Sequence, residues 1–207
     1  MSYPQPIQKI IDLFVRFPGI GPRQAGRFAF YLLGEKPETV KALAGALHAL
    51  HGEVGFCGQC YSSVAKKEGV TYEIFCKTCL DKDRDNHAIM ILEKEADLVN
   101  IERTKRFNGH YHILGGTIDP LDSTAPARLH IKELFKRVKG LKENGKSVEV
   151  ILATNATTDG DATALYLERV LQPLEVKITR LGRGLTTGTE LEYSDEATIV
   201  NALTNRK

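Results

Sequence analysis

Four cysteines constrain this chain more than any other feature of its sequence. They form two pairs in the spacing Cys-x2-Cys-x15-Cys-x2-Cys, at Cys57, Cys60, Cys76 and Cys79. Each pair can turn two thiolates toward one point, so the two pairs supply the four soft ligands of a tetrahedral Zn²⁺. Because four thiolates leave no position for water, we expect a structural zinc finger over residues 56–80 that carries out no chemistry.

A disulfide pair and a thioredoxin-like redox site are the alternatives for these cysteines. The sequence has no signal peptide and no apolar run long enough to span a bilayer, which predicts a soluble cytoplasmic protein without a membrane partner. Disulfides are rare in the reducing cytoplasm, and a redox motif is rarely doubled within one chain. The spacing therefore favours zinc.

The rest of the chain separates into modules of different periodicity. Its 207 residues are 42% apolar, which suffices for one good core and small accessory modules. Apolar residues at helical spacing predict a helical module over residues 1–55. From residue 86 to 182, β-prone runs alternate with helical runs, which predicts right-handed βαβ units and a parallel sheet. Residues 183–207 read as a glycine-rich loop, a short strand and a last helix, so the expected fold class is a multi-module α/β protein.

Charge is distributed unevenly, although the net charge is only +2. The run from Arg128 to Lys146 is rich in Lys and Arg, and its only acids are Glu133 and Glu143. Such asymmetry is typical of an anionic partner, but solvated helix faces are often equally basic.

The stretch FPGIGPRQAGRFAF, residues 17–30, interrupts the helical module with glycines and prolines. Gly19 and Gly21 permit a tight reversal, which predicts a helix-hairpin-helix. Small residues there let the backbone approach a phosphate, and free N–H groups of the second helix point toward it. Arg23 and Arg27 lie one turn apart on the same face, so the hairpin is a candidate for sequence-independent DNA binding. A plain αα-hairpin with solvated arginines is the alternative.

Glu93 and the run ATNATTDGD follow two strands of the predicted sheet, at the edge where open α/β sheets place functional groups. This combination resembles the Toprim domain, the metal-dependent module of topoisomerases, primases and some nucleases. The resemblance implies a magnesium site made of the glutamate and an Asp-x-Asp pair, whose positions are here occupied by Asn155 and Thr157. Mg²⁺ needs carboxylates or phosphates, so we predict that Glu93, Asp159 and Asp161 form an acidic surface for a partner protein. A Toprim-type nuclease or primase-like enzyme that uses these acids is the alternative.

The order of the modules resembles the bacterial recombination mediators of the RecR family, over nearly the whole chain. The resemblance is carried by the hairpin stretch, the paired cysteines and the runs IERTKRFNGHYHILGGTIDPLD, VILATNATTDGDATALYLERVLQPL and GLTTGTELEYSDEATI. The chain departs from the family pattern at Glu93-Lys94-Glu95, where Glu-Glu-Pro is common, and at Asn155-Ala156-Thr157, where Asn-Pro-Thr is common. The gap between its cysteine pairs is also longer than usual.

This resemblance implies a non-enzymatic DNA repair protein that forms a ring-shaped homotetramer and works with RecO and RecF at single-strand gaps. Together these proteins help RecA displace single-strand-binding protein and load on DNA. Arg23 and Arg27 would then face the hole of the ring. The Toprim acids would face a partner, and the C-terminal segment would pack on a neighbouring subunit. A protein scaffold whose basic hairpin serves only assembly is a further alternative.

Overall fold

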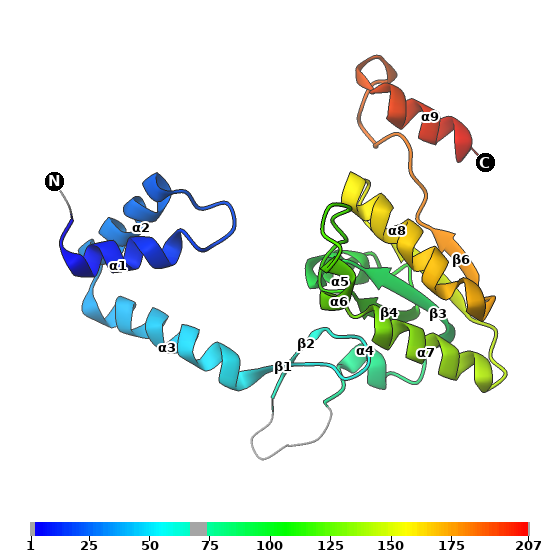
Figure 1. Cartoon of the computed structure of the whole chain (residues 1–207), viewed down its shortest axis with the longest axis horizontal. Helices are drawn as coiled ribbons and strands as arrows, with labels where there is room; N and C mark the ends of the chain where they lie inside the picture. The colour runs from blue at the N-terminus through cyan, green and yellow to red at the C-terminus, as the bar shows by residue number, and fades with distance from the viewer. Residues whose placement is uncertain (1–2, 67–73, 207) are drawn as a thin grey trace. The chain divides into compact units, whose positions relative to one another are not determined.

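The chain divides between Val54 and Gly55 into two units, which are described separately. The computed structural model describes residues 3–66 and 74–206, and Figure 1 shows their helices and strands. Part of the predicted finger, residues 67–73, lies outside the described residues. The boundaries predicted for the finger, the Toprim domain and the C-terminal segment stay predictions.

Three helices form the first unit, as the helical spacing predicts: α1 Gln5–Phe14, α2 Pro22–Gly34 and α3 Pro37–Glu53. Each has proline in its first two positions, where the missing N–H costs no hydrogen bond. Ile7, Ile11 and Phe14 recur at the spacing that places them on one face of α1. They pack against Ala25 and Ala29 of α2, whose small side chains let the two helices approach closely.

The cysteine-bearing segment follows α3. Strands β1, Val54–Phe56, and β2, Ser63–Ala65, pair with each other, and the first cysteine pair lies in the turn between them. The second pair lies at the start of the short helix α4, Lys77–Leu80.

A four-stranded parallel sheet forms the centre of the second unit, in the order β4-β3-β5-β6. The strands are β3 Asp85–Leu92, β4 Gly109–Ile113, β5 Glu149–Ala153 and β6 Lys177–Arg180. The chain places β4 on one side of β3 and then returns to add β5 on the other side. Because Leu92 pairs with Ala153, the carboxyl ends of β3 and β5 lie side by side. Residues that follow these two strands, Glu93 and Thr154 onward, therefore meet at one edge of the sheet.

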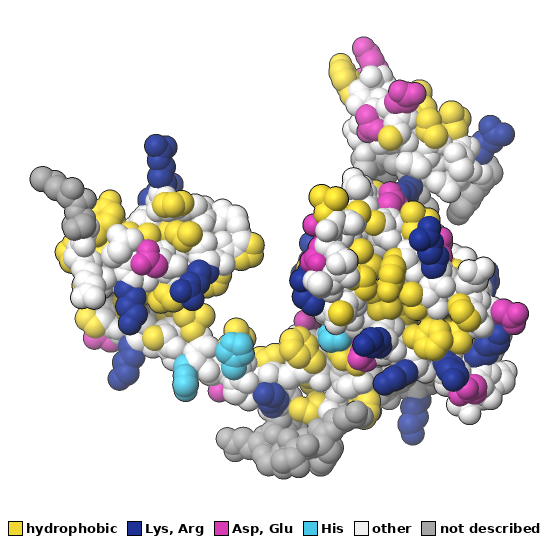
Figure 2. Space-filling model, viewed as in Figure 1, with side chains coloured by type: hydrophobic (Ala, Val, Ile, Leu, Met, Phe, Trp, Pro, Cys, Tyr) yellow, Lys and Arg dark blue, Asp and Glu magenta, His cyan; other side chains and the backbone are white. Residues whose placement is uncertain are grey.

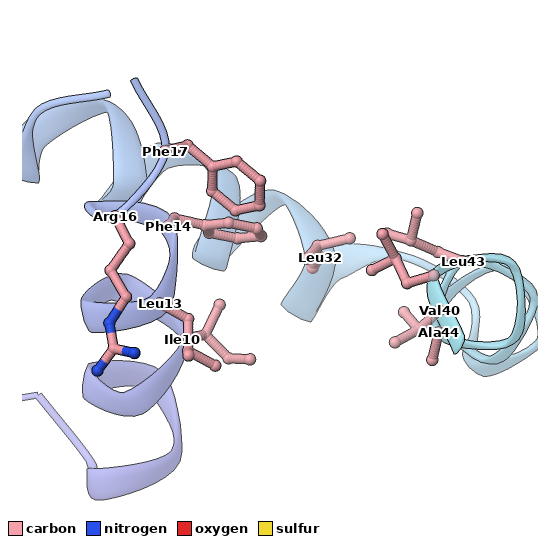
Figure 3. Close-up of a pocket in the computed structure, with 10 residues that line it drawn as sticks. Ile10, Leu13, Phe14, Arg16, Phe17, Leu32, Val40, Leu43 and Ala44 are labelled. Carbon is pink, nitrogen blue, oxygen red and sulfur yellow. The ribbon is translucent and has the colours of Figure 1, made fainter. Parts of the chain in front are cut away.

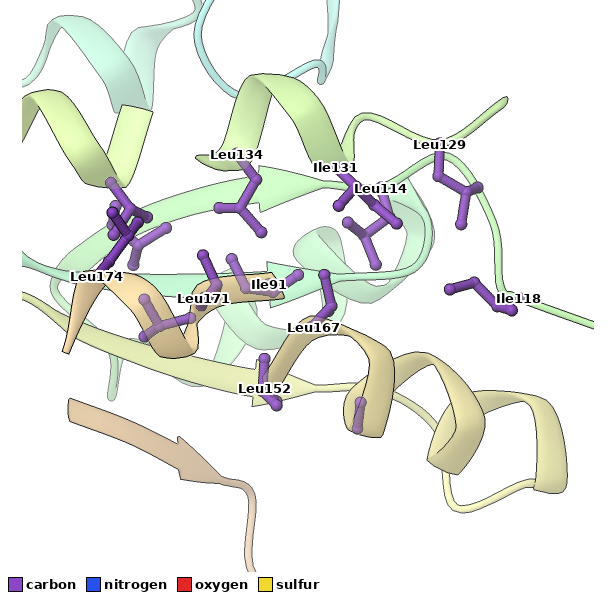
Figure 4. Close-up of a cluster of buried hydrophobic side chains, with 14 of the residues drawn as sticks. Ile91, Leu114, Ile118, Leu129, Ile131, Leu134, Leu152, Leu167, Leu171 and Leu174 are labelled. Carbon is purple, nitrogen blue, oxygen red and sulfur yellow. The ribbon is translucent and has the colours of Figure 1, made fainter. Parts of the chain in front are cut away.

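Helices cover both faces of the sheet, as parallel sheets require. The larger core lies beneath α7, Ile131–Glu143, and α8, Thr158–Leu171, whose apolar side chains point toward β3 and β5 in Figure 4. Two short turns, α6 Ala125–Arg128 and η1 Gln172–Leu174, border this core. On the other face, α5, Glu95–Thr104, packs on Met90 and Leu92. The predicted α/β alternation is thereby confirmed.

The tail corrects one part of the predicted fold. It ends in helix α9, Glu196–Thr204, as expected, and the Asp195 carboxylate caps that helix by accepting from Thr198 N at 2.9 Å. The predicted short strand is a 3-10 turn instead, η2, Leu191–Tyr193. An extended segment needs a neighbouring strand for its hydrogen bonds, and the described residues give this one no such neighbour.

Helix α8 begins at Thr158, and the Thr157 side chain caps it by accepting from Gly160 N. Within residues 3–66 and 74–206, no helix is both long and apolar enough to cross a membrane.

Candidate functional site

The four cysteines meet in space. One ligand atom from each lies within 4.8 Å of all the others, and the Sγ atoms of Cys60 and Cys76 are 3.4 Å apart. Four sulfurs around a tetrahedral Zn²⁺ are separated by about 3.8 Å, given Zn–S bonds of about 2.3 Å. All four cysteines are free of disulfides. The donor set therefore fits a four-thiolate metal ion.

Crowding couples the ionisation of the four thiols. A hydrogen bond from Cys60 lowers the pKa of Cys57 to about 5, whereas hydrogen bonds with Cys57, Cys60 and Cys76 raise the pKa of Cys79. Protons are thus shared unequally among sulfurs that cannot all become anions at close range. A divalent cation at the centre removes this conflict by deprotonating all its ligands.

The cysteine knuckle, residues 57–61, is attached to the edge strand β4. Ile113 N donates to the carbonyl of Cys60 at 2.9 Å, so the knuckle continues the hydrogen bonding of the sheet at that edge. The Tyr61 ring stacks on His130, with 3.7 Å between ring centroids. From α7, Arg137 Nη1 donates to the carbonyl of Gln59 at 3.3 Å. Sequence reasoning missed all three attachments because their partners lie far apart along the chain.

Gly19 and Gly21 form the hairpin between α1 and α2. Gly19 has a φ of +77°, a left-handed conformation that strains any residue with a Cβ. Gly21 is the extended N-cap of α2, and no side chain caps that helix. A Cβ at either glycine would meet nothing within 4 Å, so the backbone here is open to an approaching group.

Arg23 and Arg27 lie on the exposed surface of α2. Together with Gly26, Phe30 and Tyr31 they line a hollow of about 870 Å³. Neither arginine makes an ion pair within the part of the chain that the structure describes. The geometry suits an anionic ligand, and the assignment of these residues to DNA stays a prediction.

Glu93 lies where the sequence predicts, at the carboxyl end of β3, but its side chain is only 6% exposed. Asn155 satisfies both of its oxygens: the backbone N donates to Oε1 at 2.7 Å, and the side-chain amide Nδ2 donates to Oε2. In a Toprim site the corresponding pair would be two carboxylates with a metal between them. Here the backbone and side-chain N–H groups of Asn155 instead satisfy both oxygens of the buried Glu93 side chain by hydrogen bonding.

The other two predicted acids differ in their surroundings. Asp159 is exposed in the first turn of α8, where a negative charge also stabilises the helix dipole. Asp161 accepts from Arg183 Nη2 at 2.6 Å and lies 3.4 Å from Arg180 Nη1. The hydrogen bond from Arg183 is the main cause that lowers the pKa of the Asp161 carboxyl. The structure thus does not gather the three acids into one open patch, and their partner role stays a prediction.

The helical unit also carries an apolar groove of about 510 Å³ between α1, α2 and α3. Figure 3 shows Phe14 and Phe17 on one side of it and Leu43 on the other. Leu13, Phe17, Leu43 and Leu47 are each more than a third exposed. Soluble proteins rarely leave such a contiguous surface uncovered, so the groove is a candidate protein interface.

Comparison with known proteins gives matches along the whole chain. The family described as "Toprim domain" matches residues 87–182, and the family described as "RecR, helix-hairpin-helix" matches residues 7–51. The chain is 38% identical to Recombination protein RecR of Enterococcus faecalis, over all of this chain and 99% of the relative. It is 40% identical to the protein of the same name from Lacticaseibacillus casei, over all of this chain and 98% of that one. For the Nocardioides protein of that name, the identity is 42% over 97% of this chain and 96% of the relative.

Proposed function

Because the chain belongs to the RecR family of recombination proteins, we propose that it is a non-enzymatic mediator of recombinational DNA repair. The observation that carries the proposal is the similarity over full length, which includes every module from the hairpin to the tail. The mediator binds DNA as a ring-shaped homotetramer. With RecO and RecF it helps RecA displace single-strand-binding protein and load at single-strand gaps. It acts in the cytoplasm, on the nucleoid.

The hairpin is the DNA contact. Its open backbone at Gly19 and Gly21 gives a phosphate room to approach, and the uncapped N-terminus of α2 offers N–H donors. Arg23 and Arg27 add positive charge on the adjoining turn of α2. None of these groups reads a base edge, so binding depends on salt and hardly on sequence.

Arg23→Ala combined with Arg27→Ala tests this role of the hairpin. We expect weaker binding of duplex DNA, with the slope of log affinity against log salt reduced by about 0.9 for each phosphate that the variant no longer neutralises. Arg103→Ala with Arg106→Ala removes the same charge from an exposed turn of the second unit and should leave the slope near that of the wild type. If Arg23→Ala with Arg27→Ala changes neither the affinity for DNA nor the salt slope while the oligomer persists, the hairpin is not the DNA contact. That result would favour the alternative in which the basic hairpin serves only assembly.

The metal is one structural Zn²⁺ on Cys57, Cys60, Cys76 and Cys79. Four thiolates form a closed shell without a position for substrate, and soft sulfur ligands select zinc over Mg²⁺ or Ca²⁺. Elemental analysis of the purified protein should find one zinc per chain. Another metal in its place, or none, would contradict this assignment.

An enzymatic role is disfavoured by the amide at Asn155 and by Thr157, which stand where two aspartates would hold Mg²⁺. Membership of a family of recombination mediators agrees with the expectation that the chain is not an enzyme. A magnesium-dependent cleavage assay on supercoiled, linear and single-stranded DNA should show no turnover. Turnover that Glu93→Gln abolishes would refute the mediator role.

Assembly into a ring has two candidate surfaces. The apolar groove of the helical unit is one of them. The other is the tail, where Leu191, Tyr193, Val200 and Leu203 are each more than half exposed. Figure 2 shows hydrophobic side chains at the surface of both regions. A ring also strengthens binding to DNA, because several weak hairpin contacts act at high effective concentration.

Mass measurement in solution, with and without DNA and RecO, tests assembly and partners together. A tetramer that gains mass with either ligand agrees with the proposal, whereas a monomer under all conditions contradicts the ring. For the acidic surface, the exposed Asp159 offers the cleanest probe: Asp159→Asn should weaken RecO binding without changing stability by more than about 0.5 kcal/mol.

A further inference from the structure

One basic residue of α7 is partly buried without an acidic partner among the described residues. Lys132, Lys136 and Lys139 are exposed on the outer face of the helix, and the partly buried Lys142 pairs with Glu175. Arg137 is half-buried on the flank of α7, and its Nε is buried with no hydrogen-bond partner among the described residues. A buried charge of this kind needs an explanation, because leaving it unbalanced is costly.

The hydrogen bonds of Arg137 do not supply a counter-charge. Nη1 donates to two backbone carbonyls, that of Tyr111 in β4 at 2.6 Å and that of Gln59 in the knuckle at 3.3 Å. Both acceptors are neutral, and the described residues form no ion pair with this guanidinium. Gln59 lies directly before Cys60, so the guanidinium is held beside the metal-binding residues.

The metal centre has the opposite charge in excess. Four thiolates around one divalent cation carry a net charge of −2, and Cys57 and Cys60 are fully buried. Desolvation lowers the pKa of Arg137, but the field of all four cysteines opposes this and favours the charged guanidinium. Arginine stays protonated in proteins, so the cation is permanent.

We infer that Arg137 is a positioning residue of the metal centre: it balances part of the thiolate charge and fastens the knuckle to the sheet. Its two acceptors belong to the two parts that it joins, since Tyr111 lies in β4 and Gln59 lies between the first two cysteines. The hydrogen bond from Ile113 N to the Cys60 carbonyl is a second link between the knuckle and β4, and it fixes the knuckle at the same edge of the sheet. Metal retention should therefore depend on a residue of α7 that donates no ligand. The inference rests on the proposed metal and is independent of DNA binding.

Zinc release from the full-length, zinc-loaded protein tests the inference, with an excess of a colorimetric chelator as the probe. Arg137→Gln keeps a polar side chain and removes the charge, and we expect release to become at least tenfold faster. In Arg137→Lys the rate should stay within about threefold of the wild type. One nitrogen makes both of the bonds from Arg137, so a lysine ammonium can serve both carbonyls and keep the charge.

Val138→Ala is the matched control for a purely structural effect. Val138 directly follows Arg137 in α7 and is fully buried in the larger core. Its truncation therefore loosens the packing of the helix without altering the charge near the cysteines. Its release rate should stay near that of the wild type under native conditions. The inference is overturned if Arg137→Gln releases zinc as slowly as the wild type, or if Val138→Ala accelerates release equally.

If Arg137→Gln does not fold, Arg137→Met is compared with Arg137→Lys instead. Release at least tenfold faster from the methionine variant, with the lysine variant within about threefold of the wild type, supports the inference, and equal release from the two overturns it. A wild-type protein that binds no zinc would contradict the proposed metal itself, and this outcome is distinguishable because it precedes any comparison of variants.

Discussion

Two helical glycines of the second unit should respond to alanine with opposite signs. Gly160 lies in the first turn of α8, and Gly140 lies in α7. Alanine in a helix is ordinarily more stable than glycine by about 0.5–1 kcal/mol, because glycine loses more backbone freedom on folding. The two positions differ sharply in what a new methyl group would meet.

At Gly140 a Cβ meets nothing within 4 Å, so Gly140→Ala should gain the full helix preference. At Gly160 the Cβ would overlap the carbonyl oxygen of Asn155 and lie 3.0 Å from Glu93 Oε1. Overpacking of this kind costs about 1–3 kcal/mol. The backbone of Asn155 must also move, which weakens two hydrogen bonds to a buried carboxylate worth about 1.5–3 kcal/mol each. After subtracting the helix gain, we expect Gly160→Ala to lose about 2–4 kcal/mol.

Hydrogen exchange of peptides from β3 and α8 measures this difference without interference from the helical unit. In Gly160→Ala, protection of these peptides should fall by a factor of about thirty or more, and in Gly140→Ala it should rise or stay equal. Equal responses of the two variants would refute the tight contact between α8 and the loop after β5.

Three further predictions concern charge and metal. Burial lowers the pKa of His112 to about 4. The unfolded chain takes up this proton near pH 6.5, so stability is full above that pH and falls by up to about 3 kcal/mol toward pH 4. In His112→Gln, the free energy of unfolding measured with urea should not show this part of the pH dependence. Asn155→Asp places a second carboxylate against Glu93, so it should destabilise the sheet, and millimolar Mg²⁺ should restore stability to this variant but not to Asn155→Ala. Chelation of the metal should abolish hydrogen-exchange protection around the cysteines before that of the sheet, and simultaneous loss would contradict this order of unfolding.

Local chemistry made much of this molecule predictable. The cysteine cluster follows from spacing alone, because two residues between ligands suffice to turn both sulfurs to one point. The parallel sheet follows from the alternation of strand and helix patterns between residues 86 and 182. The sequence also indicates that Asn155 and Thr157 lack the charge for a magnesium site.

Contacts between distant segments were not predictable. That Asn155 donates to Glu93 depends on the strand order, which makes neighbours of residues 62 positions apart. Arg137 belongs to a run that reads as a solvated basic face, yet it lies only one residue from the buried Val138. The available signal was that Arg137 does not lie on the helix face that carries Lys132, Lys136 and Lys139. The sequence does not reveal, however, that the cysteines lie beside the face that carries Arg137. The tail strand was wrongly predicted because β propensity does not indicate whether a neighbouring strand exists.

The strand order has a consequence for how the chain folds as it leaves the ribosome. The central strand β3 can pair with β4 once Ile113 has been made, but its other neighbour, β5, begins only at Glu149, 36 residues later (149 − 113). During that interval the nascent half-sheet would have two open edges, which are the usual starting points of misassembly. The knuckle is made before either strand, and the Cys60 carbonyl already occupies a donor of β4. Metal capture during translation would thus have the knuckle in place to cover the end of the outer edge of β4, while the edge that β5 must join stays open.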